Sequence, residues 1–341
     1  MEEIKKTIFK DIYSVINKIK KCKSKSIYSI LVNELYTLYN LCDNLDINDY
    51  PKLSDYSIKS IEFKSTNDNF AYEILKNVDY HLEFAESNQV LDDLKYRNLS
   101  SYAIRNFFNS YKNLDVIYDF LNQYDEKLLK LFKEMIFEGR IIISDIKEEN
   151  NGHVHTPAYS VCSYGNFKPY IIVEQENCVA DLVHLVHELA HVREYINSDN
   201  ISNKIQVQKE HNCLEEVHSY FLQNLFVLYL KKIKYKKEDI ETIKLGYDYT
   251  FYQYIEQLWQ TLLDIEDKQI LNADIIEYLN YTYGIAIGYH FIDRYLADPI
   301  TTKKEIDNFI TINGQYDMMN MLEKFNLKDE LIDSKILKKY L

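Results

Sequence analysis

The apolar residues of this chain recur at intervals of three and four along most of its length. In residues 26–45, SIYSILVNELYTLYNLCDNL, this spacing puts the apolar side chains on one face and predicts an amphipathic helix. Residues 125–139 show the same spacing and end at Gly139, a residue that commonly terminates helices. The pattern therefore predicts successive helices from the first residues to about Leu131.

The pattern changes between residues 140 and 177. The runs RIIISDI and KPYIIVEQEN are short and rich in β-branched or aromatic residues, and turn-forming stretches flank them. Helical spacing resumes near Cys178 and continues, with breaks, to the C-terminus. We therefore predict a mainly α, multi-helical fold with a small β-sheet beside the helix that begins near residue 180. We also predict two domains, a helical N-terminal region at 1–130 and a second domain at 131–341.

Composition and charge narrow the possible partners. Of the 341 residues, 46% are hydrophobic, and only 7 Gly and 4 Pro are present, which suits long helices with few sharp turns. The 31 tyrosines accompany abundant Asn, Ile and Lys, and we interpret them as a bias of genomic base composition. The net charge of −13 argues against a nucleic-acid partner, because phosphate binding needs clustered Lys and Arg.

The sequence predicts a cytoplasmic protein without a membrane partner. Its five cysteines are scattered and none lies in a CxxC pair, which fits a reducing compartment. Charges run through the apolar pattern of residues 1–21, and no small-residue cleavage site follows, so we expect no signal peptide there. No apolar run reaches the length of a membrane span.

Three histidines and a glutamate interrupt the apolar stretch DLVHLVHELAHVREY at residues 181–195. Among them, His187, Glu188 and His191 form the pattern H-E-x-x-H. Side chains four residues apart on a helix share a face and are rooted about 6 Å apart, so both imidazoles can reach one ion. Zinc accepts such nitrogen ligands at about 2.0–2.1 Å and keeps a position for water when the protein gives three ligands. We predict one Zn²⁺ here, with Glu188 as the base; cobalt or manganese are alternatives.

A third ligand is expected from the stretch that follows, HNCLEEVHSYF. Glu215 and Glu216 lie about two dozen residues beyond His191, and a carboxylate on a crossing helix would complete a His-His-Glu site. Spacing alone does not separate the two glutamates. His211 and His218 are further alternatives.

Several separated stretches together resemble one family. AYS at residues 158–160, the KPYIIV run, the DLVHLVHELAH helix and the later EVHS are similar to the catalytic half of the thimet oligopeptidase and oligoendopeptidase F family of zinc metallopeptidases. That half contains Gly-Ala-Tyr-Ser, a Pro-Tyr strand, an Asp before the helix, H-E-x-G-H and Glu-Val-x-Ser. The resemblance covers roughly residues 153–297. It implies that Glu216 is the third ligand and that residues 131–341 are a catalytic domain.

The resemblance also implies residues that act on a peptide. The stretch EYLNYTYGIAIG is similar to the family's tyrosine-rich helix, in which a tyrosine donates a hydrogen bond to the oxyanion. Tyr281 is the best match and Tyr278 the second. We assign further substrate contacts to Tyr170, in the strand, and to His155, in the loop before it. The implied function is that of a zinc-dependent endopeptidase or oligopeptidase for short or unstructured peptides.

The chain departs from the family in three places. Ala190 occupies the position of the usual glycine in H-E-x-G-H, and the expected histidine and glycine-rich loop is not visible in LDIEDKQILNADIIEYL. The chain is also shorter, so residues before Leu131 would replace a larger N-terminal lobe. These departures leave two alternatives open: a dedicated processing peptidase for one peptide precursor, and a zinc-binding protein without turnover.

Overall fold

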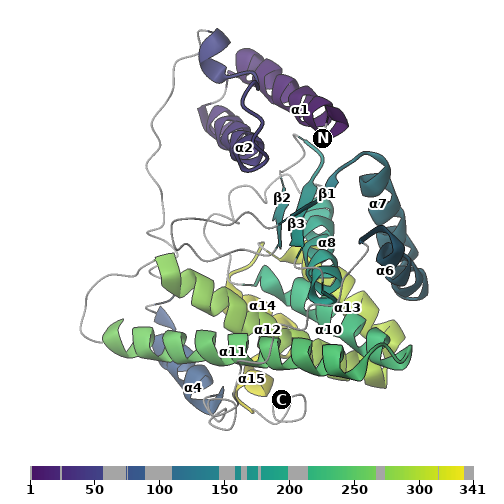
Figure 1. The fold of residues 1–341 in the computed structure, drawn as a ribbon. Coiled ribbons are helices and arrows are strands. Elements are labelled where there is room, and N and C mark those ends of the chain that lie inside the picture. Colours follow the sequence, from purple (N-terminus) through teal and green to yellow (C-terminus); the bar gives the residue numbers. More distant parts are fainter. Residues whose placement is uncertain are drawn as a thin grey trace. The chain divides into compact units, whose positions relative to one another are not determined.

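The structure, a computed structural model, describes residues 2–23, 25–56, 74, 76–88, 110–145, 158–162, 167–175, 178–198, 214–265, 273–313 and 315–333. Helices dominate this part of the chain, and one three-stranded sheet accompanies them (Figure 1). The predicted fold class, mainly α with a small sheet, is confirmed. The chain forms two compact units, Met1–Ser65 with Leu121–Glu176 and Thr66–Phe120 with Asn177–Leu341. The predicted division into domains 1–130 and 131–341 stays a prediction.

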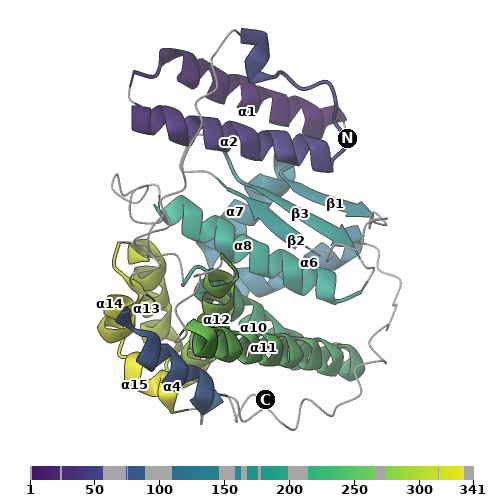
Figure 2. The ribbon, with the colours of Figure 1, turned by 90° about the vertical axis from the view of Figure 1, so that its left-hand side faces the viewer.

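The first unit combines a helix pair, a third helix and the sheet. Its helices are α1 (Glu2–Lys21), α2 (Lys25–Asn44), the short 3₁₀ helix η1 (Leu53–Tyr56) and α7 (Glu126–Phe137). Helices α1 and α2 lie side by side (Figure 2). The three- and four-residue spacing of apolar side chains explains this packing, because it buries one stripe of α1, at Ile8, Ile12, Val15, Ile16 and Ile19.

The sheet has the strand order β1-β3-β2, with β1 (Ile141–Asp145), β2 (Ala158–Val161) and β3 (Tyr170–Gln175). Strand β1 runs parallel to β3, and β2 runs antiparallel to it. The residues of the central strand from Tyr170 to Val173 are all buried, which explains the continuous apolar run in the sequence. The predicted place of the sheet beside the helix near residue 180 stays a prediction, because sheet and helix belong to different units.

A buried ion pair ties the sheet to the first helix. Helix α7 ends before Gly139, as the sequence predicted. Gly139 has a φ of 68° and turns the chain toward β1. Next to it, Arg140 places Nη1 2.9 Å from Asp11 Oδ2 of α1. The Tyr170 hydroxyl donates to the same oxygen at 2.8 Å. The Arg140 guanidinium also lies over the Tyr170 ring, 4.7 Å from its centre.

The second unit is a bundle of helices. Its helices are α4 (Val78–Asn88), α6 (Ser110–Tyr124), α8 (Ala180–Ser198), α10 (Glu216–Lys232), α11 (Lys237–Ile265), α12 (Ala273–Ala297), α13 (Pro299–Ile312), α14 (Met318–Lys324) and α15 (Lys328–Ile332). Helix α6 extends past the division between the units. Helix α10 packs against α8 and α12, and α12 packs also against α11 and α13. None of the described helices has the length and apolar character that crossing a membrane requires.

Two glycines bring α12 close to α10. A Cβ atom added at Gly284 would lie 2.3 Å from Cβ of Glu216, far inside any real contact. One turn later, a Cβ at Gly288 would lie 3.1 Å from the backbone nitrogen of Phe221. The absence of side chains at these two positions therefore sets the distance between the two helices at the first turn of α10.

Candidate metal centre

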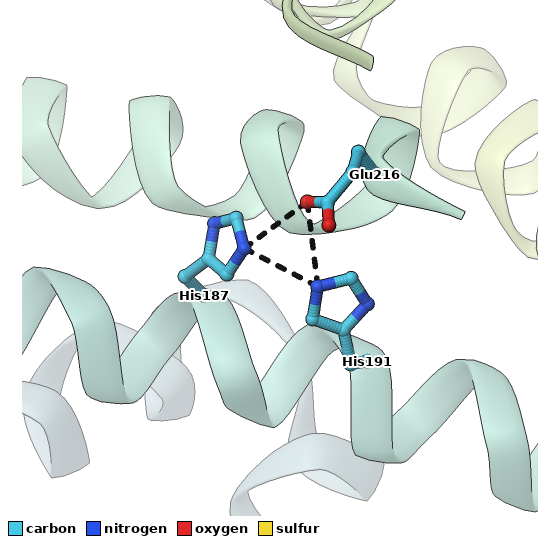
Figure 3. A group of neighbouring side chains, drawn as sticks. All are labelled: His187, His191 and Glu216. Carbon is cyan, nitrogen blue, oxygen red and sulfur yellow. Dashed lines mark hydrogen bonds and ion pairs between the residues drawn. The ribbon is translucent and has the colours of Figure 1, made fainter. Parts of the chain in front are cut away.

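Helix α8 presents two of the predicted ligands one turn apart on one face. His187 and His191 place their Nε2 atoms 3.2 Å from each other (Figure 3). Apolar neighbours hold the helix in place, since Val183, Val186 and Ala190 are completely buried. A helix that is apolar around most of its circumference packs inside a bundle, so its few polar side chains are held among other protein groups.

Helix α10 brings the third side chain from its first turn. Glu216 Oε2 lies 3.2 Å from Nε2 of His187 and 3.4 Å from Nε2 of His191 (Figure 3). The backbone N–H of Glu216 donates to Asn280 Oδ1 of α12 at 3.4 Å. Ser219 places its hydroxyl oxygen 2.9 Å from Glu216 Oε2. The carboxylate is thus fixed from its own helix and from α12.

Electrostatics in this cluster favour opposite charges. Burial lowers the pKa of His191, but the charge of Glu216 and a hydrogen bond to it outweigh burial and raise that pKa to about 10. Burial likewise opposes ionisation of Glu216. The charge of His191 and hydrogen bonds from both histidines outweigh the effect of burial and hold the pKa of Glu216 well below its ordinary range. The cluster is therefore built for a carboxylate that keeps its negative charge next to a cation.

The three side chains fit a divalent metal by number, chemistry and spacing. One ligand atom from each of His187, His191 and Glu216 lies within 4.8 Å of the others. Two imidazole nitrogens and one carboxylate oxygen are the donor set of many catalytic zinc sites. Tetrahedral ligands about 2.0–2.1 Å from zinc are separated from one another by about 3.3–3.4 Å. The observed separations of 3.2 to 3.4 Å match that spacing.

The other sequence candidates for a third ligand lie elsewhere. Glu215 is the residue before α10 and is not part of the metal-type cluster found among the described residues. His218 points to the neighbouring helix, where its Nδ1 lies 3.0 Å from the carbonyl oxygen of Ala190. His211 lies outside the described residues. The structure thus brings Glu216 to the two histidines, as the family resemblance implied, while its role as a ligand stays a prediction.

Glu188, the predicted base, follows His187 on α8 and is largely buried at 8% exposure. Its charge contributes to raising the pKa of both His191 and Tyr281. Glu188 is therefore close to the cluster without being one of its three converging ligands.

Tyr281 of α12 lies in a group of aromatic rings next to the ligands. Its ring stacks on Tyr254 of α11, with centres 4.5 Å apart and planes at 10°. Tyr220 of α10 meets the Tyr281 ring edge-on at 6.3 Å and the His187 ring at 5.1 Å. Burial raises the pKa of the Tyr281 hydroxyl, and the charge of Glu216 raises it further. The phenol is therefore held in its protonated form, in which it can donate a hydrogen bond.

Of the three predicted substrate contacts, the structure describes Tyr278 and Tyr170. Tyr278 is half-buried, with its ring 6.1 Å from that of Tyr254. Tyr170 has no exposed surface, and its hydroxyl is bound to Asp11 in the core of the first unit, so we leave it out of the proposed site. His155 lies outside the described residues.

Sequence reasoning missed three side chains around the cluster. Tyr220 and Gln223 follow Glu216 by four and seven residues, which places all three on one face of α10. That spacing was a usable signal once Glu216 had been chosen. Tyr254 had no comparable signal, because only the packing of α11 on α12 brings it to Tyr281.

No family model and no curated protein matches the sequence. Among solved structures, the inferred oligoendopeptidase F of Bacillus anthracis str. Ames is similar, with a TM-score of 0.50 and 14% identity over 92% of this chain and 63% of that one. An inferred peptidase from Chlamydophila abortus gives a TM-score of 0.46 and 14% identity over 92% and 62% of the two chains. PZ peptidase A with an inhibitor gives 0.45 and 13% over 90% and 64%.

This chain therefore spans less than two thirds of each of these structures. Only the first comparison reaches a TM-score of 0.5, and at 14% identity it speaks for the fold. At the level of the fold, this comparison confirms the resemblance that the sequence motifs indicated. The chain has a fold similar to that of the Bacillus anthracis oligoendopeptidase F structure.

Proposed function

We propose that this protein is a zinc-dependent peptidase that hydrolyses peptide bonds in short or unstructured peptides. The observation that carries the proposal is the convergence of His187, His191 and Glu216 at metal-ligand spacing. Two further groups suited to hydrolysis, Glu188 and Tyr281, accompany the cluster. The similar fold of a structure described as an oligoendopeptidase F supports the same class of reaction.

The two imidazoles and the Glu216 carboxylate would hold the zinc ion. When bound there, zinc polarises a peptide carbonyl and makes water more acidic. The Ser219 hydroxyl, next to Glu216 Oε2, helps to hold the carboxylate in its ligand orientation. The side chains of His187, His191 and Glu216 are largely buried, with 12%, 13% and 10% of their surfaces exposed.

Glu188 would move the proton during hydrolysis. Its carboxylate accepts a proton from the attacking water and passes it to the leaving amine, a transfer that contributes roughly 10²–10⁴-fold to rate. The Tyr281 hydroxyl would donate a hydrogen bond to the negative charge that develops on the carbonyl oxygen. Its raised pKa keeps that proton in place, and the stacked Tyr254 ring restrains its direction.

A Glu188→Gln variant tests the proposal most directly. We expect its cleavage rate on a fluorogenic peptide library to fall by roughly 10²–10⁴-fold, with zinc content unchanged, because glutamine keeps the shape and loses the base. The matched control is Glu241→Gln, a change at an exposed position of α11, which we expect to leave the rate unaltered. Wild-type cleavage rates in Glu188→Gln would remove Glu188 from the mechanism.

The same library separates the alternatives. Broad cleavage favours general turnover of peptides, and a narrow set of cleaved sequences favours a dedicated processing peptidase. A wild-type protein that contains stoichiometric zinc and cleaves no member of the library would contradict the peptidase proposal. It would then be a zinc-binding protein without turnover.

A further inference from the structure

The side chain of Gln223 forms a hydrogen bond with one of the proposed metal ligands. This residue of α10 is 1% exposed, and its Oε1 lies 2.8 Å from Nδ1 of His187. Its amide nitrogen, Nε2, finds no hydrogen-bond partner among the described residues. A buried amide that leaves half of its hydrogen-bonding capacity unused is costly, so the bond to His187 needs a reason beyond stability.

The bond decides which nitrogen of His187 carries the proton. An amide oxygen accepts and does not donate, so Nδ1 of His187 must carry a proton. In the neutral imidazole that binds a metal, the lone pair then lies on Nε2, the atom that faces His191 and Glu216 at 3.2 Å each. With the amide turned the other way, the proton would sit on Nε2 and would block that position for a metal.

Nothing else among the described residues takes this role at His187. The burial of Gln223 leaves no room for bulk water at its position. Tyr220 contacts the same imidazole edge-on, with centres 5.1 Å apart, and holds the ring from another side without binding Nδ1. Orientation of the ring thus comes from both neighbours, whereas selection of the tautomer comes from Gln223.

We infer that Gln223 is the positioning residue for the metal ligand His187, and that its neutral amide makes the site a weaker zinc binder than a carboxylate there would. The inference rests on the proposed function, because it takes His187 as a ligand. Partners of this kind fix ligand orientation, and a charged acceptor also makes the imidazole a better donor to the metal.

Three variants test the inference through zinc affinity, measured by competition with a chromophoric chelator and without any peptide. Gln223→Met keeps the size and removes the acceptor, so we expect zinc to bind roughly 10–100-fold more weakly. Gln223→Glu supplies a charged acceptor and should bind zinc more tightly than wild type. Asn224→Met, the same change one residue along α10, should leave the affinity unaltered.

A second readout distinguishes positioning from general stability. Cobalt-loaded wild type and Gln223→Glu should share one visible absorption spectrum, and Gln223→Met should differ, because the spectrum reports ligand geometry. Unchanged zinc affinity in Gln223→Met overturns the inference. If that variant does not fold, a Gln223→Glu protein that binds zinc no more tightly than wild type overturns it instead. Wild type that binds no zinc would refute the proposed function itself, before any variant is compared.

Discussion

The two units each bury a cluster of charged side chains, and the clusters are built in opposite ways. In the Arg140 cluster of the first unit (Asp11, Arg140, Tyr170), a guanidinium and a hydroxyl both donate to Oδ2 of Asp11. In the histidine cluster of the second unit (His187, His191, Glu216), two imidazole nitrogens and a carboxylate oxygen face one another.

The donors and acceptors present in each cluster, rather than its burial, therefore distinguish a structural cluster from a candidate binding site. The Arg140 cluster contains its own cation, so its charges are satisfied internally. The histidine cluster contains atoms that all bind a cation or a proton. Because the pKa of His191 is raised to about 10, its imidazole holds a proton at neutral pH, and a metal ion can replace that proton.

The largest expected effect comes from breaking the Arg140 cluster. Asp11→Ala leaves the buried Arg140 guanidinium with the half-buried Glu138 as its remaining ion-pair partner and deprives the buried Tyr170 hydroxyl of its acceptor. Together these losses should cost about 3–5 kcal/mol of stability. Native-state hydrogen exchange of the α1 and β3 amides measures that loss. Zinc affinity should not change, since the cluster and the proposed ligands are in different units. Asp49→Ala, which removes an exposed ion pair with Lys5, is the control and should cost far less. An equal loss in both variants would contradict the structural role of Asp11.

Zinc itself should stabilise only the second unit. At a free concentration 1,000 times its dissociation constant, a ligand that binds only the folded state contributes about 4 kcal/mol. Hydrogen exchange should show new protection in α8 and α10 and none in α1. Glu216→Gln removes the anionic ligand and should abolish the protection. Equal protection of α1 and α8 by zinc would mean that the ion acts at another place.

The site was predictable from sequence where it depends on local spacing. His187 and His191 share a helical face because they are four residues apart, and this holds for any sufficiently long helix. The choice between Glu215 and Glu216 was different. Neighbouring residues on a helix point about 100° apart, so the choice depends on how α10 crosses α8, which spacing alone does not specify.

The fold was predictable to a similar depth. The apolar runs predicted β1 and β3, but the parallel pairing of these strands depends on contacts between distant residues. Tyr170 shows the same limit at one residue. Its place in the predicted strand led us to assign it to substrate, whereas its hydroxyl is bound to Asp11, 159 residues away in sequence. The spacing of Gln223 from Glu216 placed it on the same face of α10, but its bond to His187 depends on how α8 packs on α10.

His81 offers a contrast to His191 within the second unit. This histidine of α4 is completely buried, its Nδ1 lies 2.8 Å from the Tyr283 hydroxyl, and burial lowers its pKa to about 4. The unfolded chain, with a pKa near 6.5, binds the proton first as the pH falls. Stability due to neutral His81 is therefore complete above pH 6.5 and falls toward pH 4, by about 3 kcal/mol.

A His81→Gln variant isolates this contribution. It should be less stable than wild type at neutral pH, because it disturbs the packing, but it should lose less stability between pH 6.5 and pH 4. Urea denaturation at several pH values measures both proteins. Identical acid losses in the two proteins would mean that folding does not lower the pKa of His81.

Gly284 links the packing of the second unit to the geometry of the histidine cluster. A methyl group at this position would meet Cβ of Glu216 at 2.3 Å and its backbone carbon at 2.9 Å. Neither atom is the end of a flexible side chain, so α10 and α12 must move apart. Overpacking of this kind costs about 1–3 kcal/mol, and the better helix propensity of alanine offsets about 1 kcal/mol of that cost.

Gly284→Ala should therefore lower both stability and zinc affinity, since the displaced residue is the proposed third ligand. Gly246→Ala is the matched control, because a Cβ at Gly246 of α11 meets nothing within 4 Å. That variant should gain stability, by up to about 1 kcal/mol, and should bind zinc as wild type does. Denaturation and chelator competition on both variants provide the measurement. Loss of stability in Gly284→Ala with unchanged zinc affinity would show that Glu216 keeps its place when the helices separate, and that the close approach at Gly284 serves packing rather than the site.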